Sequence, residues 1–249
     1  MSGKRQLTVL GSTGSIGRST LDVVSRCDNI SIFALSACRN SELLLSQCLQ
    51  HEPKYAVLVD PEQHKYFKRL LAVSGCKTEF LDTEDALELV AAHEQVDVVM
   101  AAIVGAAGLS SGLAAVSAGK CLLLANKESL IMSGKLFMDT AKRNNADIIP
   151  IDSEHNAIFQ CLAETRSGLS STDGRFVDKL VLTASGGPFL NTPKKALAKV
   201  TPEQACAHPK WSMGQKISVD SASLMNKGLE LIEASFLFDL PGTAIDIVV

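Results

Sequence analysis

Short apolar runs alternate along the first part of the chain with longer segments in which apolar residues recur at helical spacing. The apolar runs predict strands at Leu7–Leu10, Ile30–Leu35, Tyr55–Val59, Thr78–Leu81, Asp97–Ile103, Cys121–Ala125 and Asp147–Pro150. The segments between them predict helices, of which the clearest are Arg18–Arg26, Ser41–Gln50, Pro61–Val73 and Gly134–Asn144. Because strands that alternate with helices are typical of a parallel sheet, we expect residues 1–150 to form an α/β domain with a Rossmann-type doubly wound parallel sheet.

The pattern changes after residue 150. An apolar-periodic helix, a strand at Lys179–Thr183 and a long polar loop precede another helix near the end of the chain. We therefore expect residues 151–249 to form a second domain of the α+β class. The loop at residues 186–214 carries the single tryptophan, and we interpret it either as a lid that closes over a ligand or as an anchored surface loop.

The composition narrows the classes of function. With 24 basic and 27 acidic residues among 249, the chain offers no broad basic surface for nucleic acid or an anionic membrane, so we expect small ligands as partners. The seven cysteines include no C-x-x-C pair, which favours reduced thiols over disulfides or a zinc site. The first predicted strand begins so close to Met1 that no signal or transit peptide fits before it, and we expect a cytoplasmic protein.

A glycine-rich turn joins the first predicted strand to the first predicted helix. Its sequence is Gly11-Ser12-Thr13-Gly14-Ser15-Ile16-Gly17, with glycines spaced by three. Glycines allow the backbone to approach a pyrophosphate closely, and the N–H groups at a helix start attract its negative charge. The turn therefore predicts that Thr13, Gly14, Ser15 and Ile16 bind a dinucleotide, with a plain glycine-rich turn as the alternative.

The segment after the second predicted strand indicates which dinucleotide is bound. NAD sites usually place an acid here for the ribose 2′-hydroxyl, but no Asp or Glu occurs from Ile30 to Asn40. The guanidinium of Arg39 suits a 2′-phosphate instead, and Ser36 and Asn40 offer further hydrogen bonds. The sequence thus favours NADP over NAD, and the alternative is that Arg39 is a solvated loop residue.

Polar residues at other element ends suggest a second ligand. The tripeptide Asn126-Lys127-Glu128 follows a buried strand, where it either faces nicotinamide and substrate or begins a helix. Asp152 and Glu154 lie two residues apart, so an extended backbone would point both carboxylates to one side, where a cation would relieve their repulsion. Helix capping by Asp152 or Ser153 is the alternative reading.

The second domain contains further polar groups between apolar residues. Ser185 precedes two glycines whose N–H groups could hold a phosphate, and the polar segment Ser221–Lys227 suits an anionic group. Glu230 and Glu233 share one face of a helix and are bracketed by apolar residues. We therefore expect one of these two acids to point inward, toward a cation.

Five motifs in this order resemble the 1-deoxy-D-xylulose 5-phosphate reductoisomerase family: Gly11–Gly17, Ala125–Ser129, Pro150–His155, Ser185–Phe189 and Met225–Glu230. The resemblance runs from Leu7 to the last residue. It implies that 1-deoxy-D-xylulose 5-phosphate is converted into 2-C-methyl-D-erythritol 4-phosphate in the non-mevalonate route to isoprenoids. It also implies that the enzyme uses NADPH and a divalent metal, Mg²⁺ or Mn²⁺, and that the full-length protein is a homodimer.

The resemblance assigns roles to individual residues. The implied metal ligands are Asp152, Glu154 and Glu230, and Glu233 is not a ligand in the family pattern. The implied catalytic residues are Lys127, Glu154 and His208. The implied cofactor contacts are Thr13, Gly14, Ser15, Ile16, Arg39, Asn40, Asn126, Glu128 and Met213. The implied substrate contacts are Lys127, Ser153, Glu154, Ser185, His208, Trp211, Ser221, Asn226, Lys227 and Glu230.

Two features depart from the family pattern. Cys38 stands beside Arg39 at a position where relatives often have glycine. The chain also stops within what we interpret as an unfinished strand at Ala244–Val249, so we expect a fragment of the enzyme whose catalytic domain is incomplete. The alternatives are a metal-independent NADP-dependent dehydrogenase of another small phosphorylated substrate and a non-catalytic nucleotide-binding regulatory domain.

Overall fold

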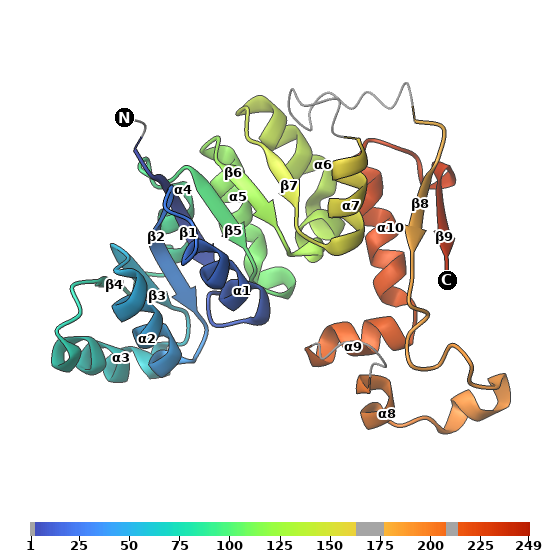
Figure 1. Cartoon of the computed structure of the whole chain (residues 1–249), viewed down its shortest axis with the longest axis horizontal. Coiled ribbons are helices and arrows are strands. Elements are labelled where there is room, and N and C mark those ends of the chain that lie inside the picture. Colours follow the sequence, from blue (N-terminus) through green and yellow to red (C-terminus); the bar gives the residue numbers. More distant parts are fainter. Residues whose placement is uncertain (1–2, 163–176, 208–213) are drawn as a thin grey trace. The chain divides into compact units, whose positions relative to one another are not determined.

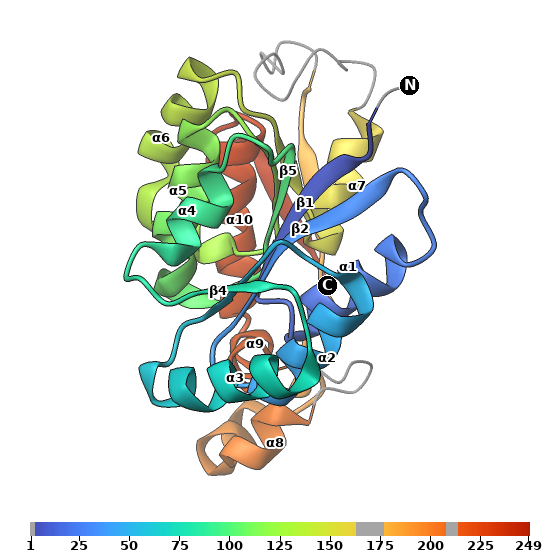
Figure 2. The same cartoon turned by 90° about the vertical axis from the view of Figure 1, so that its left-hand side faces the viewer.

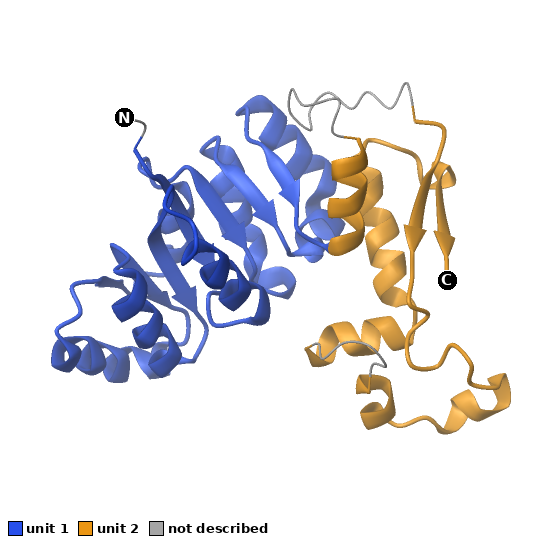
Figure 3. Cartoon of the chain, in the orientation of Figure 1, with its two compact units in different colours: residues 1–152, 168–170 blue, residues 153–167, 171–249 orange. Residues whose placement is uncertain are grey.

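The computed structural model describes residues 3–162, 177–207 and 214–249. The chain forms two compact units, and the division falls at the peptide bond between Asp152 and Ser153 (Figure 3). Each unit has its own parallel sheet.

The first unit is built on a seven-stranded sheet (Figure 1). Its strands are β1 (Arg5–Leu10), β2 (Ile30–Ala37), β3 (Tyr55–Leu58), β4 (Glu79–Leu81), β5 (Val98–Ala101), β6 (Cys121–Leu124) and β7 (Ile148–Pro150). They lie in the order β4-β3-β2-β1-β5-β6-β7, and all six pairings are parallel. The strand order changes direction between β1 and β5, which is where doubly wound sheets bind ligands beyond the carboxyl ends of their strands. The predicted Rossmann-type sheet is confirmed.

Helices cover both faces of this sheet (Figure 2). One face carries α1 (Ser15–Val24) and α2 (Ser41–His51), and α3 (Pro61–Ser74) packs beside α2. The other face carries α4 (Ala86–Ala92), α5 (Leu109–Ser117) and α6 (Lys127–Arg143). Because both faces are covered, the central strands are apolar, and Val9 and Val99 are fully buried.

Helix α6 begins earlier than the periodicity predicted. It starts at Lys127 rather than near Gly134, and Ser133 interrupts it with a φ of −141°. The sequence left open whether Asn126-Lys127-Glu128 begins a helix, and the structure shows that it does, with Asn126 as the N-cap.

The second unit contains a two-stranded parallel sheet of β8 (Leu180–Thr183) and β9 (Ile245–Val248). Its helices are α7 (Ser153–Cys161), α8 (Pro202–Cys206), α9 (Gln215–Ala222) and α10 (Met225–Leu237), with 3₁₀ turns η4 (Lys194–Lys199) and η5 (Gly242–Ala244). Helix α7 contacts β8 and α10 contacts β9. Buried Leu182, Leu237 and Phe238 contribute to the small apolar core of this unit.

The loop expected at residues 186–214 contains η4 and α8. Residues 208–213 of this loop lie outside the described part of the chain. Closure of the loop over a ligand therefore stays a prediction. Within the described residues, no helix combines the length and the apolar character needed to cross a membrane.

Candidate active site

The glycine-rich turn at residues 11–17, called the glycine turn below, follows β1 directly. Gly11 has a φ of +83°, which glycine adopts without strain. A Cβ atom added at Gly11 would lie 2.8 Å from the Ala102 carbonyl oxygen, and one added at Gly17 would lie 2.4 Å from the Gly11 carbonyl oxygen. Neither position therefore admits a side chain. Helix α1 follows the turn and begins with exposed Ser15 and Ile16.

The N-terminus of α1 fits an anion. Gly14 is its N-cap, and among the described residues no side chain accepts a hydrogen bond from the first turn at this cap. N–H groups at such a helix start are suited to a pyrophosphate. The predicted cofactor residues from Thr13 to Ile16 thus form a helix N-terminus whose backbone N–H groups suit the pyrophosphate of a dinucleotide.

Ser36, near the end of β2, holds the glycine turn through two hydrogen bonds. Its Oγ accepts a hydrogen bond from the Gly11 N–H at 2.9 Å, and its carbonyl oxygen accepts one from the Ser12 N–H at 2.7 Å. Ser12 Oγ in turn donates to Gln47 Oε1 at 2.7 Å. Ser36 is buried. Its hydroxyl oxygen therefore supports the glycine turn, and a hydrogen bond from this hydroxyl to a 2′-phosphate stays a prediction.

Arg39 and Asn40 lie between β2 and α2. Arg39 Nε pairs with Asp60 Oδ2 at 2.7 Å, and the Arg39 side chain is 77% exposed. Asn40 Oδ1 accepts a hydrogen bond from the Leu43 N–H and so caps α2. Asp60 was missed from the sequence because it comes from the following strand–helix unit, although an Asp before Pro61 is a recognisable helix cap.

Asn126 joins two loops at the carboxyl ends of β5 and β6. Its Nδ2 donates to the carbonyl oxygens of Ile103 at 2.6 Å and Gly105 at 3.0 Å. Its Oδ1 accepts from the Ser129 N–H and caps α6. The side chain is buried, so in this structure its amide positions backbone, and a direct contact with the cofactor stays a prediction.

Lys127 and Glu128 occupy the first turn of α6. Lys127 is nearly buried, and its Nζ lies 2.6 Å from Asp152 Oδ2. Both partners belong to the first unit. The pair brings one predicted catalytic residue to one predicted metal ligand.

Asp152 and Glu154 lie at the start of a helix, which was the alternative to an extended segment. Helix α7 begins at Ser153, because an acid in the first turn and apolar residues at helical spacing favour a helix here. Ser153 Oγ donates to Glu154 Oε2 at 2.6 Å. Asp152 precedes α7 by one peptide bond, and its carboxylate oxygen, with those of Glu154 and Glu230, forms a set whose members lie within 4.8 Å of one another. Asp152, Glu154 and Glu230 are called the carboxylate group below.

Lys227 and Asn226, at the start of α10, bind this group. Lys227 Nζ donates to Glu154 Oε1 at 2.8 Å and also to Glu230 Oε2, while Asn226 Nδ2 donates to Glu230 Oε1. The side chains of Lys227 and Glu230 are 6% and 1% exposed. Burial by itself would raise the pKa of Glu154, but hydrogen bonds from Lys227 and Ser153 and the charge of Lys227 together hold that pKa below its ordinary value.

The carboxylate group fits a divalent cation. Three carboxylates supply the oxygen ligands that Mg²⁺ and Mn²⁺ prefer. Each carboxylate is next to a lysine ammonium group, Lys127 at Asp152 and Lys227 at the other two. Converging carboxylates repel one another, so the site requires positive charge.

The predicted phosphate residues come from two segments of the second unit. Gly187 has a φ of +69°, and a Cβ there would lie 2.5 Å from the Ser221 carbonyl oxygen, so the loop that carries Ser185 packs against the end of α9. Ser185 Oγ accepts from the Gly187 N–H at 3.3 Å. Leu224, with a φ of +60°, turns the chain sharply from α9 into α10, where Asn226 follows. The remaining predicted residues, His208, Trp211 and Met213, lie outside the described part of the chain.

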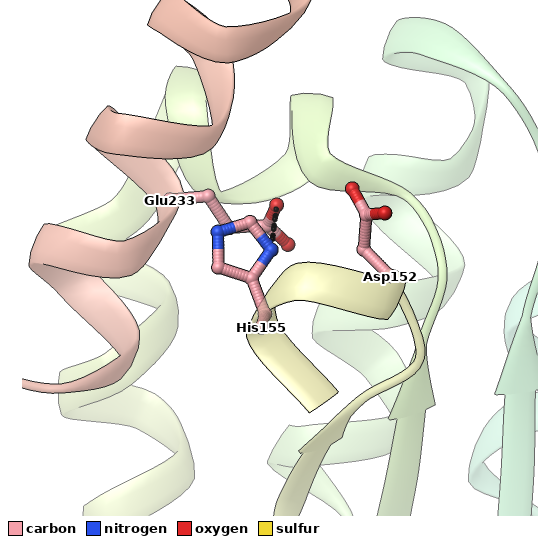
Figure 4. A group of neighbouring side chains, drawn as sticks. All are labelled: Asp152, His155 and Glu233. Carbon is pink, nitrogen blue, oxygen red and sulfur yellow. Dashed lines mark ion pairs between the residues drawn. The ribbon is translucent and has the colours of Figure 1, made fainter. Parts of the chain in front are cut away.

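A buried ion pair beside the carboxylate group was missed from the sequence. His155 Nδ1 lies 3.2 Å from Glu233 Oε2, and the two side chains are 0% and 1% exposed (Figure 4). His155 Nε2 lies 2.9 Å from the Glu230 carbonyl oxygen. One of Glu230 and Glu233 was expected to point inward, and both are buried. The apolar residues around Glu233 were the available signal.

Sequence comparisons identify close relatives of the chain. A family model described as 1-deoxy-D-xylulose 5-phosphate reductoisomerase matches residues 7–134, and a model of the C-terminal domain of that enzyme matches residues 148–238. The enzyme of this name from Cellvibrio japonicus (strain Ueda107) is 57% identical over 98% of this chain and 62% of its own length. That from Pseudomonas putida (strain W619) is 56% identical over 100% of this chain and 63% of its own length. The chain therefore spans less than two thirds of these relatives.

Solved structures give the same result. A crystal structure of DOX-P reductoisomerase in complex with NADPH, fosmidomycin and magnesium matches with a TM-score of 0.92 at 46% identity, over 98% of this chain and 60% of that one. The enzyme from Zymomonas mobilis in complex with NADPH matches with a TM-score of 0.87 at 44% identity, over 98% of this chain and 61% of that one. The first family model alone covers more than half of the sequence. The chain belongs to the 1-deoxy-D-xylulose 5-phosphate reductoisomerase family.

Proposed function

We propose that this chain carries the NADPH-binding and metal-binding parts of an enzyme that converts 1-deoxy-D-xylulose 5-phosphate into 2-C-methyl-D-erythritol 4-phosphate. The observation that carries the proposal is the carboxylate group, in which three acids converge beside two nearly buried lysines. Its occurrence in one chain with the glycine turn combines a cation site with a dinucleotide site. The related structure that holds NADPH, fosmidomycin and magnesium supports this combination.

The dinucleotide would bind at the carboxyl ends of β1 and β5. Its pyrophosphate would meet the N–H groups from Thr13 to Ile16, where added side-chain atoms at Gly11 or Gly17 would collide with backbone. Arg39 would bind the 2′-phosphate, because Asp60 holds its Nε and the side chain remains largely exposed. Asn40, Asn126 and Glu128 complete the cofactor residues of the proposal.

The carboxylate group would hold Mg²⁺ or Mn²⁺, a Lewis acid that polarises the oxygens of a bound substrate. Lys127 would contact substrate oxygens from its position beside Asp152. Ser153 would do the same from the first turn of α7, where its hydroxyl already orients Glu154.

The substrate phosphate would be bound by residues of the second unit. Ser185 and Ser221 belong to segments in close backbone contact, as the spacing at Gly187 requires. Asn226 offers an amide donor and Lys227 an ammonium group for the phosphate, and both bind Glu230 in this structure. His208, Trp211 and Met213 would belong to the lid.

We further propose that the full-length enzyme is a cytoplasmic homodimer that acts on a small ligand. The family resemblance supports a homodimer, and the charge balance supports a small ligand rather than nucleic acid or a membrane. The scattered cysteines support a reducing compartment such as the cytoplasm.

Oxidation of NADPH by the full-length protein in the presence of 1-deoxy-D-xylulose 5-phosphate and Mg²⁺ tests the reaction. We expect Glu230→Gln to lower turnover on the order of 100-fold, because one of the three metal ligands loses its charge. Asp246→Asn is the control, since Asp246 forms an exposed ion pair with Lys179 in the same unit. Unchanged turnover in Glu230→Gln would contradict the metal assignment, and turnover that persists in EDTA would support the metal-independent dehydrogenase.

Inhibitor binding separates the enzyme from a regulatory nucleotide-binding domain. Fosmidomycin carries a hydroxamate, which chelates metals, and a phosphonate, which mimics a phosphate. We expect it to bind the chain in the presence of Mg²⁺ and to be lost on adding EDTA, as measured by calorimetry. A chain that binds NADPH but binds no fosmidomycin under either condition would favour the regulatory domain.

A further inference from the structure

The buried pair of His155 and Glu233 has no part in the proposed function described so far. Both residues belong to the second unit, and Figure 4 shows the imidazole of His155 facing the carboxylate of Glu233. We propose that His155 and Glu233 are positioning residues that hold Glu154 and Glu230 in the arrangement that binds a divalent cation. This inference rests on the metal site of the proposed function.

His155 connects the two helices that supply metal ligands. It follows Glu154 directly on α7, and its Nε2 lies 2.9 Å from the main-chain carbonyl oxygen of Glu230 on α10. Since a carbonyl oxygen only accepts hydrogen bonds, Nε2 carries a proton and donates it. The imidazole of His155 thus links the helix turn that carries Glu154 to the backbone of Glu230.

Glu233 fixes the orientation of that imidazole. Its Oε2 lies 3.2 Å from Nδ1, on the side of the ring opposite to the Glu230 carbonyl. Glu233 is one helical turn beyond Glu230 on α10, so the same helix holds the ring at both nitrogens. Groups that hold metal ligands from outside commonly tune the affinity of a metal site without touching the metal.

The surroundings make this arrangement rigid. Both side chains are almost completely buried, and the Phe238 ring lies beside His155 with its centroid 6.5 Å away. Polar groups buried in apolar surroundings lose much free energy if a partner is removed. The ring therefore has one strongly favoured position. Because the ring joins α7 to α10, it also fixes the positions of Glu154 and Glu230.

A second cation site is the competing reading of the same residues. Asp152, His155 and Glu233 also offer ligand atoms within 4.8 Å of one another. However, Nδ1 of His155 already faces Glu233, and Nε2 faces the Glu230 carbonyl. A cation on Nδ1 would replace the contact with Glu233 and would share Asp152 with the first cation. The geometry therefore favours a positioning role.

Titration with Mn²⁺, followed by the electron paramagnetic resonance signal of the free ion, tests the proposal. We expect one Mn²⁺ per chain in the wild type and in Glu233→Gln, with a Kd about tenfold higher in the variant. Asp246→Asn is the matched control, because it also neutralises a paired acid of the second unit, and its Kd should stay within about twofold of wild type. A merely structural role would lower Tm and leave the Kd of the folded protein unchanged.

A second readout requires no metal. In ¹⁵N-labelled protein in EDTA, we expect the Nε2 proton of His155 to exchange slowly with solvent, and Glu233→Gln to speed that exchange. If Glu233→Gln does not fold, Glu233→Asp takes its place, since it keeps the charge and moves the carboxylate away from the His155 ring by one methylene group.

The outcomes are distinguishable. A Kd for Mn²⁺ in folded Glu233→Gln within about twofold of wild type would overturn this proposal alone. Loss of one of two bound Mn²⁺ ions would overturn it in favour of a second cation site. A wild-type chain that binds no Mn²⁺ would overturn the metal site of the proposed function together with this inference.

Discussion

The glycine turn and the carboxylate group are built from different parts of the chain, the first from backbone and the second from side chains. The turn consists of backbone, and close contacts at Gly11 and Gly17 require that no side chain be present. The carboxylate group consists of side chains, and its buried Glu230 requires the amide of Asn226 and the ammonium group of Lys227. One site depends on space and the other on charge.

This difference determines how each site fails. Packing around a backbone site is insensitive to charge and fails when atoms are added. A group of buried charges tolerates little change in charge, because each ion loses hydration and must recover it from its neighbours. Removing a charge from one site and adding an atom to the other test this contrast, and the larger effect is expected from the charge.

Removing the positive charge should damage the second unit most. Lys227→Met leaves Glu154 and Glu230 close together without the ammonium group that bonds to both, and we expect a loss of about 4 kcal/mol in the free energy of unfolding. Urea unfolding in EDTA measures this loss. Added Mn²⁺ should restore part of the stability, because a bound cation stabilises the folded state.

The exposed Lys179 provides the control for that experiment. It pairs with Asp246 at the surface, so Lys179→Met should leave the unfolding midpoint nearly unchanged. Equal losses in the two variants would show that burial of charge does not distinguish the carboxylate group.

Adding one carbon atom should damage the first unit. The Cβ of Gly17→Ala would lie 2.4 Å from the Gly11 carbonyl oxygen and 2.5 Å from Ser12 Cα, so backbone must move. We expect a loss of about 2 kcal/mol in stability and at least a tenfold weaker affinity for NADPH, measured by fluorescence. Gly3→Ala is the control, since nothing lies within 4 Å of its added Cβ. NADPH affinity equal to wild type in Gly17→Ala would refute the close packing of the turn.

The smallest effect concerns a buried group that remains neutral. Burial, with a smaller contribution from the neighbouring Cys76, raises the pKa of the Cys48 thiol to about 12, so at pH 8 its thiolate fraction is about 1,000-fold below that of an ordinary cysteine. We expect iodoacetamide at pH 8 to label the exposed Cys38 and Cys161 and to spare Cys48 until the protein unfolds. Peptide mass spectrometry reads the sites. Rapid labelling of Cys48 in the native protein would show that the first unit opens locally.

Much of the fold followed from the sequence because it depends on local periodicity. Apolar runs and helical spacing predicted the ends of several strands and helices of the first unit to within a few residues, as for β2 and α2. Local reasoning failed where short motifs could be read in two ways. The segments around Lys127 and Asp152 begin helices, which was one of the two readings that the sequence left open at each place.

The tertiary partners of site residues could not be predicted. Asp60 meets Arg39 because β2 and β3 are neighbours in the sheet, and His155 meets Glu233 because α7 and α10 pack together. Such contacts join residues far apart in sequence, and their spacing follows no helical or strand period. The proposed metal ligands were named through family resemblance, whereas the partners that hold them were found in the structure.

The central place of β1 has a consequence for the order in which the protein is made. β1 pairs with β2 on one side and with β5 on the other, and β5 ends at Ala101. During synthesis, β1 through β4 can assemble soon after they leave the ribosome, while the other edge of β1 stays open until some hundred residues have been translated. An open strand edge is a template for pairing with other chains. The open edge of β1 is therefore available for such pairing until the segment from β4 to β5 has been translated.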